Sequence, residues 1–330
     1  MTVFNSLFTN GRCSPRCTSR SLVRILRSAL RALSLIMVTT ALSKDIPQFD
    51  ADRAFRYLEK QCSFGPRNPG SVGHRECLIY LKETLSGLAD TLMVQPFAYS
   101  DPYSGKMLQL TNLVARFQPQ RKNRIWIAAH WDTRPWADRD RHESNRSTPI
   151  IGANDGASGV AVLLELAHHL AQSVPPLGVD LVLLDGEDLG KQGDLKYFFN
   201  GSRYLARHIP KPHPRYCILV DMVGDKELEL PMEGNSMEQA PKLVKLIWSL
   251  AADLGLDAFV PKIAYTVEDD HVILFQTGGI PSIDIIDFDY PNRFRNYWHT
   301  MEDTPDKCSP ASLKTVGTVL LHHIYGSGKK

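Results

Sequence analysis

The chain has 330 residues, of which 43% are hydrophobic and 22% charged, and its net charge is +2. These proportions are ordinary for a globular protein, so they exclude a largely disordered chain and a fold that depends on disulfide bonds. Residues 1–43 carry six arginines and no acid, so the rest of the chain is acidic on balance. Nucleic-acid binding therefore has no support from the bulk charge.

The Arg-rich N-terminal segment runs into an apolar stretch, LSLIMVTTALS, at residues 33–43. An apolar core of this length followed by Ala41-Leu42-Ser43 is typical of a signal peptide and is too short to cross a bilayer comfortably. We predict a leader over residues 1–43, a signal peptide or anchor, and an extracytoplasmic protein, secreted or periplasmic. A mitochondrial presequence, or a start codon placed too far upstream, would also explain this composition. The catalytic domain is predicted over residues 44–330.

Helical and strand patterns alternate along this domain. Amphipathic helices are predicted over residues 50–63 and 73–88, with a Gly/Pro-rich stretch between them. Farther along, short apolar runs rich in β-branched residues predict strands at 107–117, 124–130, 179–185, 216–223 and 281–288. Helical patterns lie between and after them, at 157–172, 201–208, 237–254 and 310–325. This alternation predicts a single α/β domain with a central, mostly parallel twisted sheet and helices on both faces.

Acids and histidines stand close to the ends of the predicted strands or just before a helix. They are His130, Asp155, the pair Glu187 and Asp188, Asp221, and His299. Because ligand sites in open α/β sheets lie outside the carboxyl ends of the strands, five separate segments can bring these side chains to one edge. Each has a simpler explanation when taken alone, since Asp155 could be a helix N-cap and His299 an ordinary loop histidine. Their convergence favours a functional site.

A catalytic zinc ion needs about three protein ligands from histidine and carboxylates, together with an open position. In the pair Glu187-Asp188 one residue can bind metal while the other moves protons, because neighbours in a turn point in different directions. The small residues around Asp155, in GANDGASG, would let the backbone lie close to the metal and leave room for substrate. No Gly-rich phosphate loop follows a strand, so a nucleotide cofactor is not expected.

Within a similarity that spans roughly residues 48–326, seven motifs follow one another: HWDTR, GANDGASG, LLDGEDLG, GSRYLA, VDMVGD, DDH and YWHT. Together they resemble the zinc aminopeptidase superfamily and, within it, the glutaminyl cyclases (glutaminyl-peptide cyclotransferases). The resemblance implies a zinc-dependent enzyme that acts on a peptide with a free N-terminus. As a cyclase, an acyltransferase, it would convert N-terminal glutamine to pyroglutamate and release ammonia. As a metallo-aminopeptidase, a hydrolase, it would remove N-terminal residues.

The resemblance also implies roles for individual residues. Asp155, Asp188 and His299 match the ligands of the zinc common to both branches, and Asp188 stands where most relatives have glutamate. Glu187 matches the general acid and base.

Two further positions bear on the number of zinc ions, which the sequence leaves at one or two. His130 and Asp221 match the residues that bind a second zinc in two-metal aminopeptidases. In the cyclases a single zinc is bound, and Asp221 joins Asp269 and Glu187 in a hydrogen-bonded acid network. The sequence leaves the oligomeric state open.

Three features favour the cyclase: EDDH at residues 268–271, Asp221 within VDMVGD, and Trp298, which would form an apolar wall for the substrate. Against it, the segment after Asp188 lacks a tryptophan that the animal cyclases carry, and HWDTR keeps a complete potential second-metal site. The cyclase is the main expectation and the aminopeptidase is the alternative. A non-catalytic binding domain of the same fold that has lost its metal is a third candidate. Such domains usually have another residue in place of a metal ligand, whereas Asp155, Glu187, Asp188 and His299 are all present here.

Overall fold

The computed structural model describes residues 46–326; residues 1–45 and 327–330 lie outside the described residues, and so does the predicted leader. No helix in the described part of the chain is long and apolar enough to cross a membrane.

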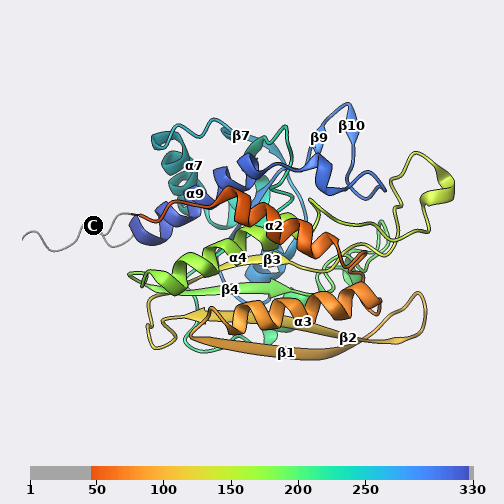
Figure 1. The fold of residues 1–330 in the computed structure, drawn as a ribbon, viewed down its shortest axis with the longest axis horizontal. Coiled ribbons are helices and arrows are strands. Elements are labelled where there is room, and N and C mark those ends of the chain that lie inside the picture. Colours follow the sequence, from red (N-terminus) through yellow and green to blue (C-terminus); the bar gives the residue numbers. More distant parts are fainter. Residues whose placement is uncertain (1–45, 327–330) are drawn as a thin grey trace, which may run out of the picture. The chain divides into compact units, whose positions relative to one another are not determined.

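A six-stranded sheet forms the centre of the described domain, and Figure 1 shows its helices packed around it. Strands β4, β3, β5 and β8 run parallel, whereas β1 and β2 pair antiparallel at one edge. The strand order is β1 (Thr91–Ser100), β2 (Met107–Phe117), β4 (Gly178–Leu184), β3 (Arg124–His130), β5 (Cys217–Asp221) and β8 (Ser282–Ile286). The expected mostly parallel sheet is confirmed.

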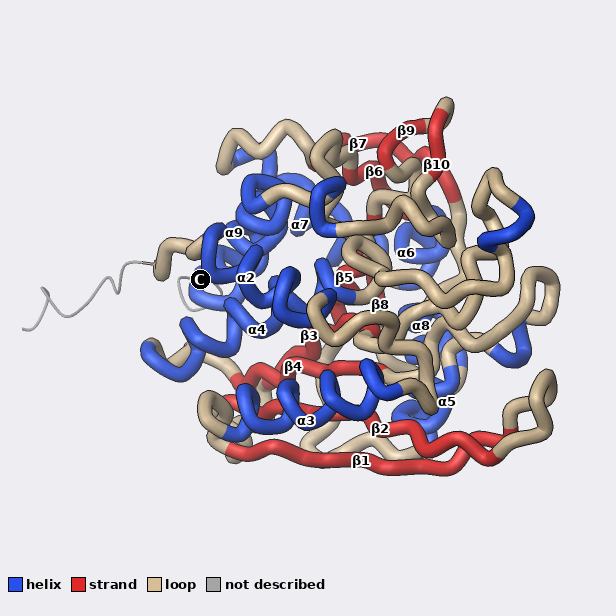
Figure 2. Tube along the Cα trace, turned by 45° about the vertical axis from the view of Figure 1, so that its right-hand side comes forward, coloured by secondary structure: helices blue, strands red, loops and turns tan. Residues whose placement is uncertain are grey.

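Helices cover both faces of this sheet, as Figure 2 shows. One face packs against α2 (Ala51–Cys62), α3 (Val72–Ser86), α4 (Ala157–Gln172), α7 (Pro241–Asp253) and α9 (Pro310–Gly326). The other carries α5 (Asn200–Arg207) and α8 (Asp270–Gln276). Strand β3 alternates between the two cores, since Ile125 and Ile127 belong to the first and Trp126 and Ala128 to the second. A strand buried on both faces reads as a continuous apolar run, which is why β3 and β4 are recognisable in the sequence.

The single helix predicted over residues 237–254 is wrong, because the structure has two helices there. Helix α6 (Gly234–Gln239) ends before Ala240, and α7 begins at Pro241. Proline lacks an N–H and suits the first position of a helix, so it starts α7 and interrupts the helical pattern.

Several elements have no counterpart among the predicted ones. They are β1, α8, the parallel pair β6 (Leu230–Glu233) and β7 (Phe259–Tyr265), and the small hairpin β9 (Pro291–Asn292) and β10 (Arg295–Asn296). Three short 3-10 helices complete the described part: η1 (Glu143–Asn145), η2 (Leu195–Tyr197) and η3 (Pro305–Lys307). Strand β1 is an edge strand whose residues are all exposed or half-buried, so it lacks the apolar run of a buried strand.

Candidate active site

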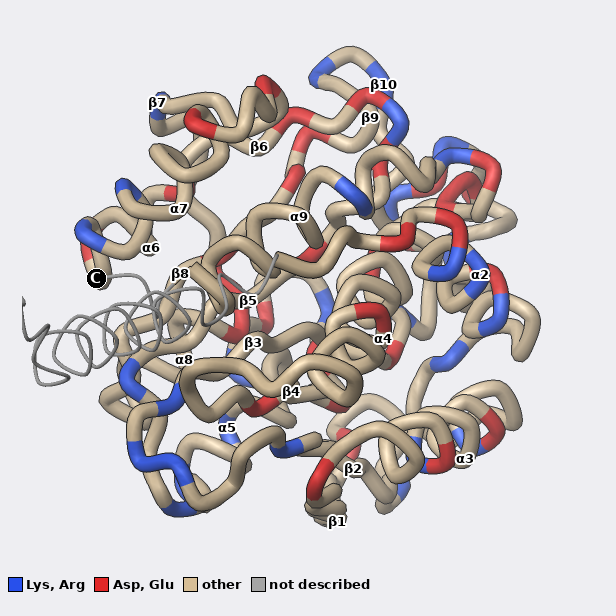
Figure 3. Tube along the Cα trace, turned by 60° about the vertical axis from the view of Figure 1, so that its left-hand side comes forward, with Lys and Arg blue, Asp and Glu red and all other residues tan. Residues whose placement is uncertain are grey.

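The predicted residues meet at the carboxyl ends of the parallel strands. His130 ends β3 and Asp221 ends β5, while Glu187 and Asp188 lie in the loop after β4. Acidic positions lie beside β3 and β5 in the interior of the domain (Figure 3). The remaining predicted residues come from the turn before α4 and from the loop after β10: Asp155 and His299.

Asp155 is the centre of the cluster because each of its carboxylate oxygens faces a different histidine. Oδ1 lies 3.2 Å from His130 Nε2, and Oδ2 lies 3.4 Å from His299 Nε2. His130 Nε2 also lies 3.1 Å from Asp221 Oδ1, and His299 Nε2 lies 3.3 Å from Asp188 Oδ2. Two triads therefore share Asp155, and either could hold a metal ion.

The glycines around Asp155 allow a close approach between backbones. Gly156 has φ +99°, and a Cβ there would lie 2.6 Å from the carbonyl oxygen of Asp132. A Cβ on Gly159 would lie 2.3 Å from the carbonyl oxygen of Val220. The start of α4 can thus press against the ends of β3 and β5. Close packing of neighbouring segments, more than room for substrate, explains these small residues.

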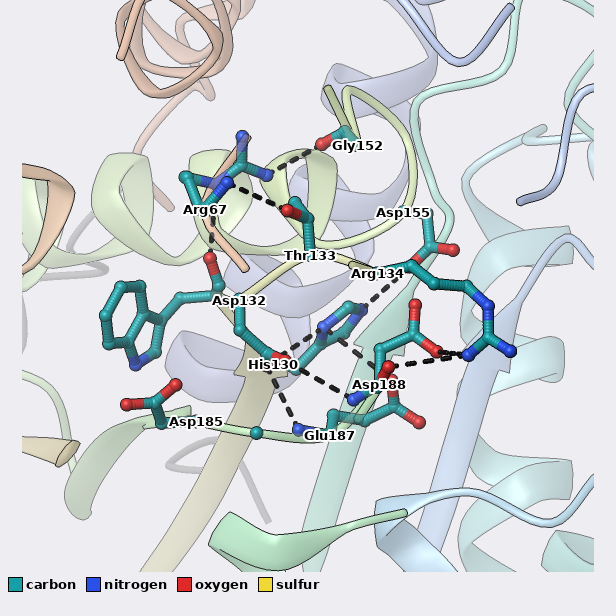
Figure 4. A network of polar contacts seen from close by, with 12 residues as sticks. Arg67, His130, Asp132, Thr133, Arg134, Gly152, Asp155, Asp185, Glu187 and Asp188 are labelled. Atoms are coloured by element: carbon teal, nitrogen blue, oxygen red, sulfur yellow. Dashed lines mark hydrogen bonds and ion pairs between the residues drawn. The ribbon is translucent and has the colours of Figure 1, made fainter. Parts of the chain in front are cut away.

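Buried side chains that sequence reasoning missed hold this turn in place, and Figure 4 shows part of the network. Arg67 donates to the carbonyl oxygens of Gly152 at 2.7 Å and Ile151 at 2.8 Å. Asp303 accepts the backbone N–H groups of Asn154 at 2.8 Å and Asp155 at 3.1 Å. These partners lie 84 or more residues from the turn along the chain, so no local pattern points to them.

Asp132 contacts both His130 and the loop after β4. Its carboxylate lies 3.6 Å from His130 Nδ1, and it accepts the backbone N–H groups of Glu187 at 3.1 Å and Asp188 at 3.3 Å. It thereby ties the loop after β4 to the end of β3 (Figure 4). Asp185, which lies in the LLDGEDLG motif with Glu187 and Asp188, is turned away from the cluster and pairs with His74 at 2.9 Å.

Arg134 and Asp138 were also not singled out from the sequence. Arg134 Nη1 lies 2.6 Å from Asp188 Oδ1, and its other nitrogens donate to Asp138 at 2.7 Å. Asp138 Oδ1 lies 3.5 Å from His299 Nδ1. Such partners orient the groups that would bind a metal and adjust their basicity.

A cavity of about 340 Å³ opens on this cluster. Its acidic walls include Asp155, Glu187, Asp188, Asp221 and Asp269. Aromatic side chains complete it, among them Phe198, Phe288 and the predicted wall residue Trp298. The Trp298 ring centroid lies 3.9 Å from that of His299 and 5.0 Å from that of Phe288. The cavity thus joins an acidic region with an aromatic one, as a substrate pocket requires.

Burial dominates the protonation of the acids on the cavity wall. It raises the pKa of Glu187 well above its usual range, and the charge of Asp188 acts in the same direction. Burial, followed by the charge of Asp221, raises the pKa of Asp269 to about 7. Burial also raises the pKa of Asp221. These carboxyl groups therefore hold their protons more tightly than exposed acids do, which suits acid and base chemistry.

The donor set fits a zinc ion. Asp155 Oδ2 and Asp188 Oδ2 are buried, and neither has a hydrogen-bond partner within residues 46–326. Leaving buried carboxylate oxygens unpaired is costly, so such oxygens need a cation or a proton. One histidine and two carboxylates around an open cavity match the ligands of catalytic zinc sites. Asp155, Asp188 and His299 could therefore hold a metal ion.

Comparison with known proteins identifies the family. The model of Peptidase family M28 matches residues 112–324, more than half of the chain. The chain belongs to peptidase family M28. It is similar to a glutaminyl cyclase from Bacteroides thetaiotaomicron, with a TM-score of 0.81 and 39% identity over 85% of this chain and 99% of that one.

Two further proteins illustrate the range of this M28 chain's relatives. A Zn-dependent exopeptidase from Parabacteroides distasonis has a TM-score of 0.80 and 34% identity, over 85% of this chain and 99% of that one. A glutaminyl-peptide cyclotransferase from Boiga dendrophila is 27% identical, over 77% of this chain and 75% of its own length. The expected fold class and the resemblance to the superfamily are confirmed.

Proposed function

We propose that this chain is a zinc-dependent glutaminyl cyclase, which converts the N-terminal glutamine of a peptide to pyroglutamate and releases ammonia. The observation that carries the proposal is one cavity that joins the metal-binding triad, the buried acid Glu187 and the wall residue Trp298. The similarity to a bacterial glutaminyl cyclase, at 39% identity over 85% of the chain, supports the same reaction.

Asp155, Asp188 and His299 would hold the zinc ion. When bound, zinc supplies Lewis-acid chemistry, which polarises the γ-carboxamide of the glutamine and stabilises negative charge on its oxygen. Arg134 and Asp138 keep Asp188 and His299 oriented towards this position.

Glu187 is the proposed proton carrier. The peptide's α-amine forms a new bond to the γ-carbonyl carbon, and the bond from that carbon to the amide nitrogen breaks. Glu187 accepts the proton that the amine loses and passes it to the departing nitrogen, which leaves as ammonia. Burial raises its pKa, which makes Glu187 a stronger base than an exposed glutamate and helps it accept the amine's proton.

Asp221 and Asp269 line the same cavity as Glu187 and are proposed to act with it as an acid network. Asp221 contacts His130 directly at 3.1 Å, and Asp269 accepts the backbone N–H of Asp270. Trp298 is proposed to pack against the substrate side chain and to keep water away from the reacting carbonyl.

A single zinc ion is favoured because the two triads differ in their pairing. In the triad of His130, Asp155 and Asp221, the histidine hydrogen-bonds to Asp221 at 3.1 Å. The other triad contains the two carboxylate oxygens that lack donors within residues 46–326. The alternative, a metallo-aminopeptidase, is favoured by the completeness of the second triad and by the similarity to a Zn-dependent exopeptidase.

Secretion to an extracytoplasmic site, through a leader at residues 1–43 followed by a catalytic domain at 44–330, stays a prediction from the sequence. N-terminal sequencing of the protein recovered from its native source tests it. A mature N-terminus near residue 44 is expected, and a mature N-terminus at Met1 would contradict cleavage.

The deciding experiment offers the full chain, with zinc, a Gln-peptide and a Leu-peptide side by side. Ammonia release and free amino acid release are followed together. Ammonia together with a peptide product that lacks a free amine is the expected result. Free leucine without ammonia would contradict the cyclase and support the aminopeptidase with a second zinc at His130 and Asp221.

A further inference from the structure

Behind the active-site wall, a row of buried acids and a histidine continues into the interior. Asp269 lines the cavity and caps the N-terminus of α8. Asp284 in the middle of β8 and His271 in α8 are fully buried, and Asp269, His271 and Asp284 bring side-chain atoms within 4.8 Å of one another. Glu233 at the end of β6 is buried next to His271. The proposed mechanism assigns no task to Asp284, His271 or Glu233.

The inner half of this row is well paired. Glu233 accepts hydrogen bonds from Asn235 N at 2.8 Å, Ser236 N at 2.6 Å, Ser236 Oγ at 2.7 Å and Val267 N at 3.1 Å. His271 Nε2 lies 3.1 Å from its carboxylate. Burial would raise the pKa of Glu233, but these partners outweigh it and lower that pKa to about 2. Glu233 is therefore a fixed anion, and it holds the His271 ring through Nε2.

The outer half of the row is not paired in this way. Both carboxyl oxygens of Asp284 are buried, and no donor within residues 46–326 reaches them. His271 Nδ1 lies 3.9 Å from Asp284 Oδ2, too far for a hydrogen bond. The other close group is the carboxyl of Asp269, which is also an acceptor when ionised. Two facing carboxylates in the interior repel each other, so the pair needs a proton or a cation between them.

Burial raises the pKa of Asp284 well above its usual range. The charges of Asp269, Asp221 and Glu233 act in the same direction. Asp269 accepts the backbone N–H of Asp270, which favours its ionised form, whereas no such donor within residues 46–326 reaches Asp284. Asp284 is thus the member of the pair that keeps the proton, and as a neutral carboxyl group it can donate to Asp269.

We propose that Asp284, next to the pair of His271 and Glu233, is a protonated positioning residue that donates a hydrogen bond to Asp269. This hydrogen bond would keep the Asp269 carboxylate fixed on the cavity wall, facing the site where the substrate amine would bind. The catalytic part of this inference rests on the proposed function, whereas the proton on Asp284 does not.

The proposal makes asparagine and alanine behave differently at position 284. The side-chain amide of Asp284→Asn still offers an N–H donor to Asp269 in nearly the same volume. Asp284→Ala removes the donor. We expect kcat of Asp284→Asn to stay within about threefold of the unaltered chain, and kcat of Asp284→Ala to fall about 10- to 100-fold with KM nearly unchanged.

The test measures kcat, KM, thermal unfolding and metal content for the full chain and for both variants, loaded with zinc. Asp287→Ala is the matched control, because Asp287 is a buried acid just beyond β8 that lines a different cleft. Its kcat should not change. Infrared spectra at pH 7 give a readout independent of activity, since the carbonyl band of neutral carboxyl groups should lose the intensity of one such group in Asp284→Asn.

Three results would overturn the proposal. The first is an Asp284→Asn variant as impaired as Asp284→Ala, since the charge and not a donor would then matter. The second is a metal ion that is lost from Asp284→Asn, which would place a cation between the two acids. The third is an unchanged carboxyl band. If the unaltered chain releases leucine instead of ammonia, the proposed function fails, and the same comparison made on the Leu-peptide decides the role of Asp284.

Discussion

Glu187 is the residue on which the proposed chemistry depends most directly. Glu187→Gln keeps the shape of the side chain but cannot accept a proton. We expect turnover to fall by about 10²- to 10⁴-fold, as is usual when a general acid and base is removed. Zinc should stay bound, because Glu187 is not one of the proposed ligands. Turnover and metal content of the purified variant check both expectations, and full activity would refute the role of Glu187 as proton carrier.

His323 is expected to make stability depend on pH away from the active site. It is buried, and its Nε2 lies 2.7 Å from the Tyr216 hydroxyl oxygen. Burial, together with the charge of Arg215, lowers its pKa from 6.5 to about 4. As the pH falls below 6.5, His323 therefore binds a proton in the unfolded chain, whereas in the folded chain it stays neutral until about pH 4.

This group thus lowers the free energy of unfolding as the pH falls through that window, by up to about 3 kcal/mol. Glutamine does not titrate, so His323→Gln should lack this contribution. Urea unfolding of both proteins between pH 7.5 and pH 4.5 should show the stability of the original chain declining more steeply. Parallel stability curves would contradict the prediction.

Helix α4 lies against the sheet so closely that one methyl group should disturb the site. Gly159→Ala would normally favour a helix, but here the new Cβ would lie 2.3 Å from Val220 O and 3.0 Å from Ala129 Cβ. We expect a loss of about 1–3 kcal/mol in stability, as in overpacked cores, and lower activity, because Asp221 follows Val220 directly.

Gly87→Ala is the control at the element scale. Gly87 follows α3 with φ −78°, and a Cβ there would lie 3.6 Å or more from other atoms. Its effect on thermal unfolding and turnover should be small. Equal effects of the two substitutions would show that close packing of α4 on the sheet is not what requires Gly159.

For the whole molecule, metal binding should contribute to stability because the proposed ligands come from distant segments. Asp155 precedes α4, Asp188 follows β4, and His299 follows β10. A metal ion bound only by the folded chain stabilises it by mass action. A chelator should lower Tm by on the order of 10 °C, and added zinc should restore it.

Asp155→Asn is the control for this prediction. Because it alters the shared ligand, its Tm should respond little to chelator or to zinc. Thermal unfolding with metal analysis of both proteins provides the measurement. A Tm that stays constant while the metal is removed would contradict a zinc site that ties these segments together.

The parts of the fold predicted correctly are those with a strong local pattern. Buried strands such as β3 and β4 are continuous apolar runs, and α4 is a long helical one. Strand β1 was not predicted because an exposed edge strand lacks a continuous apolar run, and α8 was not predicted because it has only seven residues. The break between α6 and α7 was missed because Pro241 was taken as part of one long helical pattern, whereas it marks the start of a second helix.

The buried strands of the parallel sheet, the residue types at their ends and the family could be read from the sequence, because motifs and periodicity are local properties of the chain. The tertiary structure alone decided which of those side chains are paired. Asp155 is held by Asp303, 148 residues away along the chain, and Asp269 faces Asp284 across two elements. Whether a buried carboxylate has a donor depends on distances between segments that folding brings together, and no local pattern encodes those distances.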